Sequence, residues 1–259
     1  MGAITAAKHG LAAREPNSNG DAAGFQDASA ILRFALTGTL KGKTAVLSSF
    51  GTESAVLLHL VAQVDRAAPI LFLDTGKLFE ETLQYRTQLS SFLGLSDVRT
   101  ISPSQPDCLV HDSCGTLWSQ NADMCCNLRK TAPLLTALEP FLAQVTGRKR
   151  FQTQARSDMS ATEFNDGRLR FNPLAGWSRE ELELYFEEYK LPRHPLARAG
   201  YPSIGCRPCS RRVAEGDAYR SGRWPDHKKE ECGIHCVQNA DFDTVPEPID
   251  ATMPMCACD

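Results

Sequence analysis

Short apolar runs alternate with helical segments through the first half of the chain. The runs typical of β-strands cover residues 43–50, 68–76, 97–103 and 141–147. Helical periodicity occurs between them, over residues 53–64 and 77–94. Strands that alternate with helices favour a mostly parallel sheet with helices on both of its faces. We therefore predict a fold of the α/β class.

The strand signal fades after residue 165, and the second half of the chain is less regular. A helix is predicted over 177–191, with Ser178 as its N-cap and Glu181 completing a capping box. Prolines, glycines, arginines and cysteines follow this helix. We expect a flexible lead-in, a single α/β domain and a mobile tail, over residues 1–25, 26–225 and 226–259 respectively.

One loop in this pattern offers a site for an anion. The sequence SSFGTES, residues 48–54, follows the first predicted strand and leads into a helix. Its small residues expose backbone N–H groups, and such loops lie at the carboxyl edge of an open sheet, where ligands bind. A plain turn capped by Thr52 or Ser54 is the alternative. The Walker-like GTLKGKT, residues 38–44, is no such site, because it precedes its strand instead of following one.

Composition argues against two classes of protein. The formal net charge is −3, which disfavours a nucleic-acid-binding protein, and no apolar run is long enough to span a membrane. The N-terminus lacks the apolar stretch of a signal peptide, so we expect a cytoplasmic protein. Ten cysteines in a reducing compartment favour metal binding or thiol chemistry over disulfides.

Two cysteine pairs supply four thiols that could act together. They are the adjacent Cys125 and Cys126 and the Cys-x-x-Cys pair of Cys206 and Cys209. Four thiolates can hold an iron–sulfur cluster, in which each sulfur binds a separate iron. A zinc site would normally show two Cys-x-x-Cys knuckles, and an adjacent pair fits its small tetrahedron poorly. Zinc, a redox disulfide between Cys206 and Cys209, and unrelated buried thiols remain alternatives.

Basic residues follow each cysteine pair. Arg129 and Lys130 follow the first, Arg211 and Arg212 follow the second, and further basic residues occur in 146–150, at Arg156 and in 219–224. In a chain of net negative charge, these clusters favour a pocket for a small polyanion, because guanidinium groups suit phosphate and sulfate oxygens. A solvated basic face is the alternative.

Several motifs occur together in the order of one known family. They are SSFGTESAVLLH, LDTGKLFEET, CCNLRK, TGRKRFQTQAR, FNPLAGW, GCRPCSR and KKEECGIH, and they run from about residue 40 to His235. This set resembles the assimilatory adenylylsulfate and phosphoadenylylsulfate reductases, in particular their iron–sulfur-containing bacterial members. The resemblance implies an adenine-nucleotide α-hydrolase-like fold of the PP-loop type, which agrees with the α/β prediction.

The resemblance also implies which residues form the site. Cys125, Cys126, Cys206 and Cys209 would ligate one [4Fe–4S] cluster. The phosphate loop would be Ser48, Ser49, Gly51, Thr52 and Glu53, with the adenosine along the strand that ends in LFLDTG. The phosphosulfate and the ribose would contact Lys130, Gly147, Arg148, Arg220, Arg223 and His235. The stretch RKRFQTQAR departs from the family pattern at Phe151 and at Gln154–Ala155, which weakens the roles of Lys149, Arg150 and Arg156.

Cys232 matches the family's catalytic nucleophile, and its polar surroundings are not those of a buried structural cysteine. The implied reaction reduces adenylylsulfate to sulfite and AMP through an S-sulfocysteine, with thioredoxin or glutaredoxin as reductant, in sulfate assimilation and cysteine biosynthesis. Lys228 and Lys229 would favour the thiolate of Cys232, and Glu230 and Glu231 would oppose them. The remaining tail thiols, Cys236, Cys256 and Cys258, are interpreted as incidental, with a resolving role for Cys236 as the alternative.

Other functions stay open at this point. Members with the four cysteines use adenylylsulfate, yet the plentiful cations also allow phosphoadenylylsulfate or both. A fold-sharing ATP pyrophosphatase-type ligase would want an SGGxDS-like loop, which SSFGTES does not match. A zinc- or cluster-bearing binding module would predict an excess of basic charge. The partners expected are a small-molecule substrate and the protein reductant, with no nucleic acid or membrane, and a homo-oligomer is an open alternative to a monomer.

Overall fold

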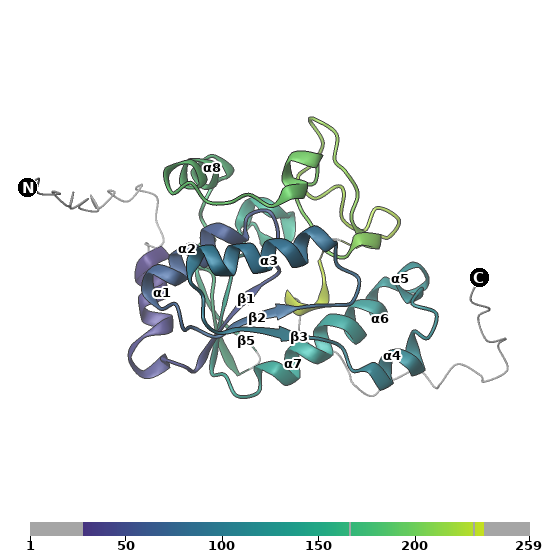
Figure 1. The fold of residues 1–259 in the computed structure, drawn as a ribbon, viewed down its shortest axis with the longest axis horizontal. Helices are drawn as coiled ribbons and strands as arrows, with labels where there is room; N and C mark the ends of the chain where they lie inside the picture. The colour runs from purple at the N-terminus through teal and green to yellow at the C-terminus, as the bar shows by residue number, and fades with distance from the viewer. Residues whose placement is uncertain (1–27, 166, 230, 236–259) are drawn as a thin grey trace, which may run out of the picture.

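A six-stranded sheet organises the computed structural model, which describes residues 28–165, 167–229 and 231–235 (Figure 1). The strand order is β3-β2-β1-β4-β6-β5. All neighbouring pairs are parallel except β5 and β6, which form an antiparallel hairpin at the edge. The strands are β1 (Thr44–Ser48), β2 (Ile70–Leu73), β3 (Val98–Ile101), β4 (Ala143–Thr146), β5 (Thr162–Asn165) and β6 (Arg168–Phe171). The prediction of a mostly parallel α/β sheet is confirmed.

Helices cover both faces of this sheet (Figure 1). One face packs against α1 (Ala28–Leu36), α2 (Ser54–Val64), α3 (Glu80–Leu93) and α8 (Arg179–Glu188). The other packs against α7 (Ala132–Leu138). Alternate strand residues serve the two faces, because successive side chains of a strand point in opposite directions. Val46 and Phe72 belong to the first core, and Ala45 and Leu71 belong to the second.

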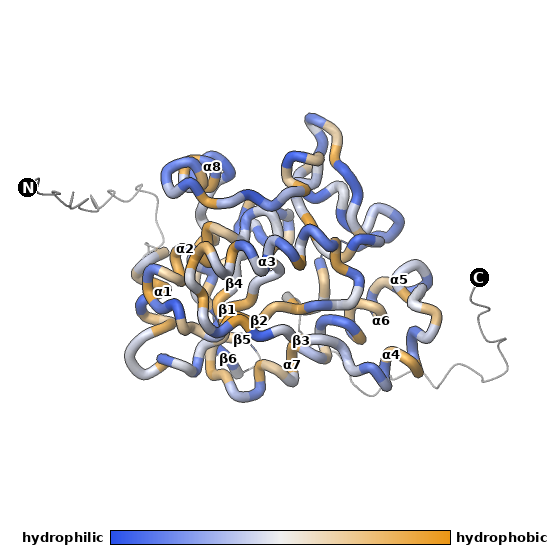
Figure 2. Tube along the Cα trace, viewed as in Figure 1, coloured by the Kyte–Doolittle hydropathy of each residue, from blue (hydrophilic) through white to orange (hydrophobic). Residues whose placement is uncertain are grey.

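The hydropathy of the chain follows this layering. Figure 2 shows hydrophobic positions along β1 and β2 and many hydrophilic positions along α8. The predicted capping box of α8 is present, since Glu181 N donates to Ser178 Oγ at 3.1 Å and Ser178 N donates to the Glu181 carboxylate at 2.8 Å. No helix in the described part of the chain combines the length and the apolar character needed to cross a bilayer.

Although the strand signal in the sequence fades after residue 165, one more strand, β6, follows and pairs with β4. Its sequence RLRF carries two arginines, which hid the strand. Arg168 donates to the carbonyl oxygens of Phe141 and Leu138 at 2.9 and 3.0 Å, and Arg170 lies 3.7 Å from the Glu163 carboxylate. Tertiary contacts thus accommodate charged side chains that alternation alone would place in solvent.

The region between β3 and β4 also contains helices that the sequence did not indicate. They are α4 (Gln105–His111), α5 (Leu117–Gln120) and α6 (Ala122–Cys126), followed by a π-helical turn (Asn127–Thr131) that continues into α7. After α8 the described chain contains short 3₁₀ turns, at Pro195–Ala199, Arg207–Cys209 and Gly233–His235, and two isolated β-bridges, Leu78 with Cys206 and Ser210 with Arg223. Both regions lie beside the carboxyl ends of β1 and β2 (Figure 1).

Candidate active site

A pocket of about 210 Å³ lies at the carboxyl edge of the sheet. Its walls come from the loops after β1, β2 and β4, from the region between α8 and Trp224, and from the segment around Cys232. The site residues predicted from the sequence that line it are Ser48, Ser49, Gly51, Thr52, Glu53, Lys130, Gly147, Arg148, Arg220, Arg223 and Cys232. His235 belongs to the turn after Cys232, but its side chain lies outside what the structure describes.

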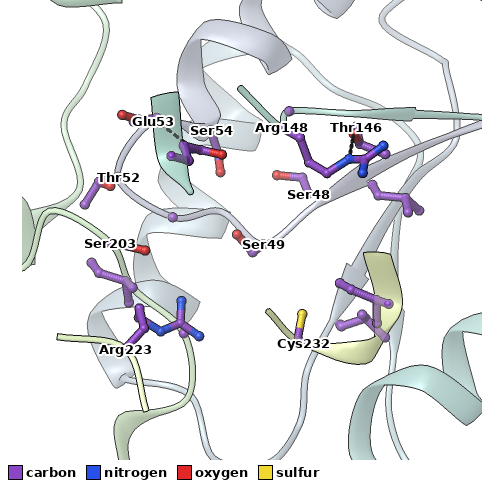
Figure 3. Close-up of a pocket in the computed structure, with 18 of the residues that line it drawn as sticks. Ser48, Ser49, Thr52, Glu53, Ser54, Thr146, Arg148, Ser203, Arg223 and Cys232 are labelled. Atoms are coloured by element: carbon purple, nitrogen blue, oxygen red, sulfur yellow. Dashed lines mark hydrogen bonds between the residues drawn. The ribbon is translucent and has the colours of Figure 1, made fainter. Parts of the chain in front are cut away.

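The loop after β1 is shaped by a buried aromatic residue. Phe50 has a left-handed backbone (φ 47°), is fully buried, and packs edge to face against Phe72 with ring centroids 5.4 Å apart. Its backbone N–H donates to Ser48 Oγ at 3.2 Å. The N-cap of α2 is Glu53, without a side-chain cap, so neither Thr52 nor Ser54 caps this helix. The turn is therefore held by the Phe50 side chain and leaves Ser49 facing the pocket (Figure 3).

Glu53 does more in the structure than complete the loop. Its carboxylate accepts from Lys149 Nζ at 2.6 Å and from Gln152 Nε2 at 2.9 Å. Arg148 is similarly occupied. It donates to Thr146 Oγ1 at 3.2 Å (Figure 3). It also forms a 2.7 Å ion pair with Glu163. Two of the basic groups on this wall are thus already paired with carboxylates.

The opposite wall carries cations gathered around Trp224. The charged groups of Arg223, Arg220 and Lys130 lie 4.5, 5.8 and 6.0 Å from the centre of its ring. Burial, together with the nearby Arg223, lowers the pKa of Arg220 to about 10. The buried Nε of Arg223 has no hydrogen-bond partner among the described residues. This wall therefore favours an anionic ligand, which would relieve both the mutual repulsion and the unsatisfied donor.

A glycine makes this arrangement of Arg223 feasible. An added Cβ at Gly205 would lie 2.2 Å from Arg223 Nη2 and 2.6 Å from Cζ, so a side chain at position 205 would displace the guanidinium. Position 205 immediately precedes the second cysteine pair, and the motif GCRPC therefore fixes the position of a pocket cation as well as the two thiols.

Cys232 lies half-buried at the mouth of the pocket and faces the same space as Ser49 and Arg223 (Figure 3). Burial alone would lower the pKa of Lys130, but its electrostatic interaction with Cys206, Cys232 and Cys126 raises it above its ordinary value. Lys130 is thus charged and close enough to Cys232 for the two groups to interact. A thiolate beside cations is a nucleophile, and a polyanion held by those cations would be its target.

The residues that carry Cys232 pack against the protein. Ile234 contacts the apolar cluster of Ala45, Leu71 and Leu134 beneath α7. Lys229, expected to help activate the thiol, forms an ion pair with Asp123. Glu231, expected to oppose it, pairs with Arg156 at 2.5 Å. Of the predicted tail, residues 236–259 and Glu230 lie outside the described residues, as do Cys236, Cys256 and Cys258.

All four cysteines of the predicted metal site line one small second pocket, together with Lys77, Trp118, Arg129 and Lys130. Cys125, Cys126, Cys206 and Cys209 are buried free thiols, so Cys206 and Cys209 form no disulfide here. In the described parts of the chain, no three side chains of the metal-binding types come close enough together to hold a single ion. A zinc ion needs its sulfurs about 2.3 Å from one point, whereas an iron–sulfur cluster spreads its ligands over separate irons. Four thiols around one pocket fit the cluster better than the ion.

Polar contacts surround the cysteine pocket and connect it with the larger one. Thr75 Oγ1 lies 3.2 Å from Cys206 Sγ. Arg129 donates to Asp112 at 2.6 and 3.0 Å and to the Thr75 carbonyl at 3.0 Å. Lys130 and Cys206 line both pockets. Residues that bind a group in the second pocket are therefore next to any ligand in the first.

Several pocket residues were not singled out from the sequence. Gln152, Tyr219 and Trp224 line the pocket, and Asp112 fixes Arg129. Gln152 and Tyr219 lie within or beside motifs already noted, so position in a motif was the available signal. Nothing local marks Asp112, because its role arises from the distant Arg129. Arg156, whose role the departing motif had weakened, is buried in the pocket wall.

Known proteins are similar to this chain in sequence and in fold. Residues 43–212 match the model of the phosphoadenosine phosphosulfate reductase domain. An adenosine 5′-phosphosulfate reductase of Mesorhizobium japonicum is 47% identical over 74% of this chain and 75% of the relative. Another, from Chelativorans sp., is 46% identical over 75% of this chain and 80% of the relative. A crystal structure of phosphoadenylyl-sulfate reductase from Candida auris has a TM-score of 0.60 at 23% identity, covering 70% of this chain and 88% of that one, a likeness that shows the fold.

Proposed function

The chain belongs to the phosphoadenosine phosphosulfate reductase family, and from that premise we propose that it reduces adenylylsulfate to sulfite and AMP in sulfate assimilation. One observation carries the proposal: Cys232 shares a pocket with Lys130, Arg220 and Arg223 at the carboxyl edge of the sheet. A nucleophilic sulfur beside three cations is suited to attack on a polyanion. The names of two relatives, both adenosine 5′-phosphosulfate reductases, support the substrate.

The substrate would lie across the pocket. Apolar side chains at the ends of the central strands, among them Leu47, Leu71 and Leu73, offer a surface for the adenosine. The phosphosulfate would lie between the loop after β1 and the cations around Trp224, with its sulfur toward Cys232. The Cys232 segment, residues 231–235, would cover the bound mixed anhydride and keep water from hydrolysing it.

The first step transfers sulfur to the protein. The Cys232 thiolate attacks the sulfate sulfur, an S–S bond forms, and the bond from sulfur to the phosphate oxygen breaks. AMP leaves with the electron pair of that bond, and S-sulfocysteine remains at position 232. Lys130, Arg220 and Arg223 would neutralise charge on the sulfate and the departing phosphate as the bond breaks.

The second step uses a protein dithiol, for which we propose thioredoxin. One of its thiolates attacks Cys232 Sγ, and sulfite leaves with the electron pair of the S–S bond. The second thioredoxin thiol then attacks the mixed disulfide and restores the Cys232 thiol. Thioredoxin has supplied two electrons and is oxidised to its disulfide, which balances the reduction of sulfate to sulfite.

The buried cysteines suit a resident cofactor. Cys125, Cys126, Cys206 and Cys209 would hold a [4Fe–4S] cluster, whose charge would tune the electrostatic field at the sulfate when it is bound. The steps above draw no electron from it. Lys130 lines both pockets, so it would lie between the cluster and the substrate and interact electrostatically with both.

Labelling of the protein tests the proposal directly. Anaerobically purified protein is mixed with sulfur-labelled adenylylsulfate in the absence of reductant, and the label is mapped by mass spectrometry. We expect label on Cys232 and its release as sulfite when thioredoxin is added. The variant Cys232→Ser should take up no label, whereas Cys108→Ser, which changes a half-buried thiol outside both pockets, should label as the parent does.

The other outcomes discriminate among alternatives. Label that appears only with the 3′-phosphorylated compound would keep the mechanism and change the substrate. Absence of label with either compound would reject the reductase function. Label on Cys232→Ser would reject Cys232 as the nucleophile.

A further inference from the structure

We propose that Glu231 is a positioning residue, which holds the neighbouring Cys232 at the pocket through a buried ion pair with Arg156. The inference rests on the proposed function for the role of Cys232, and it adds a residue whose part in the reaction is indirect. The side chains of Glu231 and Arg156 are only 10% and 7% exposed. An acidic residue this deeply buried, one position before the nucleophile, is not a solvated tail residue.

The carboxylate of Glu231 contacts groups from two regions of the chain. Arg156 Nη2 donates to Oε2 at 2.5 Å, and Thr153 Oγ1 donates to Oε1 at 3.1 Å. Arg220 Nη2 lies 3.8 Å from Oε2. Both carboxylate oxygens therefore have a partner on the turn after β4, and the peptide that joins Glu231 to Cys232 is held close to that turn.

Arg156 is itself fixed, which makes it a rigid anchor. Its Nη1 donates to Gln152 Oε1, and the amide nitrogen of the same Gln152 donates to Glu53 at 2.9 Å. Glu53 belongs to the loop after β1. A continuous path of hydrogen bonds thus runs from that loop through Gln152 and Arg156 to Glu231, and its last member is bonded covalently to Cys232.

The ion pairs in the pocket favour a positioning role for Arg156 over a role in substrate binding. Among the described residues, the Nε atoms of Arg156 and Arg223 both lack a hydrogen-bond partner, so this feature does not separate them. The difference is that Arg156 faces a carboxylate at hydrogen-bonding distance, whereas no ion pair with a carboxylate holds Arg223 in the described residues. A phosphosulfate would be bound by Arg223 and Lys130, and Arg156 would keep the thiol in reach. Since an ion pair can open without breaking a covalent bond, the same contact allows Cys232 to leave the pocket and meet a protein reductant.

Alkylation of Cys232 measures this positioning without reference to activity. The full-length protein is treated with iodoacetamide in the absence of substrate, and the rate of modification at Cys232 is followed by mass spectrometry. In Glu231→Gln we expect the rate to rise about tenfold, because loss of one partner of a buried ion pair strongly weakens the contact. The matched control is Asp226→Asn, which makes the same charge change at an exposed residue of the same region and should alkylate as the parent does.

A second readout separates positioning from binding. In single turnovers with labelled adenylylsulfate, Glu231→Gln should form S-sulfocysteine about 10- to 100-fold more slowly, because a misplaced reacting group loses that much rate. The affinity for adenylylsulfate, measured in a Cys232→Ser background, should stay close to its original value. The double variant Glu231→Gln/Arg156→Met removes the unpaired buried charge, so it distinguishes loss of positioning from loss of folding, and it should behave like Glu231→Gln.

Two results would overturn the inference. One is alkylation and single-turnover rates in Glu231→Gln equal to those of Asp226→Asn. The other is an affinity for adenylylsulfate that falls as much as the rate, which would make Glu231 or Arg156 a binding group. Neither result touches the proposed reduction itself, which fails only if the unmodified protein takes up no label on Cys232.

Discussion

On one side of the pocket, the loops after β1 and β4 continue directly from strands whose residues are almost completely buried. On the other side, the described residues from 195 to 235 contain short 3₁₀ turns and isolated β-bridges. The first side is positioned by backbone pairing and apolar packing. The second is positioned by separate local contacts, which include the isolated bridge of Ser210 with Arg223, the packing of Ile234 and the ion pair of Glu231 with Arg156.

This difference suits the proposed reaction. The loops of the sheet side shape the pocket before a ligand arrives, so a rigid sheet edge is the better support for them. The thiol must meet a small substrate and then a protein, so the segment that carries it must be able to open locally. The comparison therefore predicts that changes on the sheet side will affect global stability and that changes on the other side will affect binding and exposure of Cys232.

The largest effect on stability should come from a substitution that creates a cavity in the core of the sheet side. Leu58 of α2 is fully buried in the main core, and Leu58→Ala should lower the free energy of unfolding by about 2–5 kcal/mol. Leu184→Ala, on an exposed position of α8, should change it by less than about 0.5 kcal/mol. Urea denaturation measures both. Equal losses in the two variants would contradict the assignment of the core.

A pH-dependent loss of stability should come next, at the junction of the two sides. His194 is completely buried, lies 3.1 Å from Thr82 Oγ1, and packs against Tyr85. Burial lowers its pKa from 6.5 to about 4, opposed by the nearby Glu81. The unfolded state therefore takes up the proton first as the pH falls, and the folded state should lose about 2–3 kcal/mol between pH 6.5 and pH 4.

The check is the free energy of unfolding measured across that interval of pH. His194→Gln cannot take up the proton, so its stability should vary less with pH than that of the parent. A parent and a variant with parallel pH profiles would assign the effect to other groups.

The cations of the second side should dominate ligand binding. Arg223→Met should weaken binding of adenylylsulfate by about 1.5–3 kcal/mol, the range for a hydrogen bond to a charged group, whereas Ser49→Ala on the sheet side should cost about 0.5–1.5 kcal/mol. Calorimetry in a Cys232→Ser background measures both without turnover. A larger loss from Ser49→Ala would reverse the roles given to the two walls.

The smallest effect should be that of salt. Raising the ionic strength shortens the screening length from about 10 Å at 0.1 M to about 3 Å at 1 M. The contact of Lys229 with the exposed Asp123 should weaken, whereas the buried pair of Glu231 and Arg156 is screened much less. Iodoacetamide should therefore modify Cys232 only a few times faster. The free cysteine Cys108 serves as the internal reference, since general changes in reagent reactivity affect both. A constant ratio of the two rates would argue that apolar packing, such as that of Ile234, holds the segment instead.

The sequence indicated the two sides of the pocket by different signals. Periodicity identified the four strands and two helices that build the sheet side, and Ser178 and Glu181 marked the start of α8, because these signals depend on neighbours along the chain. The second side has no period, and its residues were found only through motifs such as GCRPCSR and KKEECGIH. The family and its fold are confirmed by the comparisons.

The remaining features depend on residues far apart in the sequence. Arg170 is buried in β6 because Glu163 lies beside it, and a local pattern cannot show that pairing. The roles expected of Lys229 and Glu231 assumed that they act on the adjacent thiol. In the structure, Lys229 contacts Asp123, 106 positions away, and Glu231 contacts Arg156, 75 positions away, so neither partner could be read from the neighbouring sequence.

The π-helical turn at Asn127–Thr131 has a consequence for how the cysteine pair is coupled to the rest of the fold. Successive residues of an α-helix are rotated by about 100°, and a π turn accommodates one extra residue, so it offsets the phase of everything that follows. Before the offset, Cys125 and Cys126 face the small pocket; after it, Leu134 and Leu138 face the sheet. Deletion of one residue from this turn would make the helix regular. Either the cysteines would then turn away from the small pocket or the leucines would turn away from the sheet. The π turn thus rotates the helix that follows it, so that one continuous helix can place its cysteines at the small pocket and its leucines on the sheet.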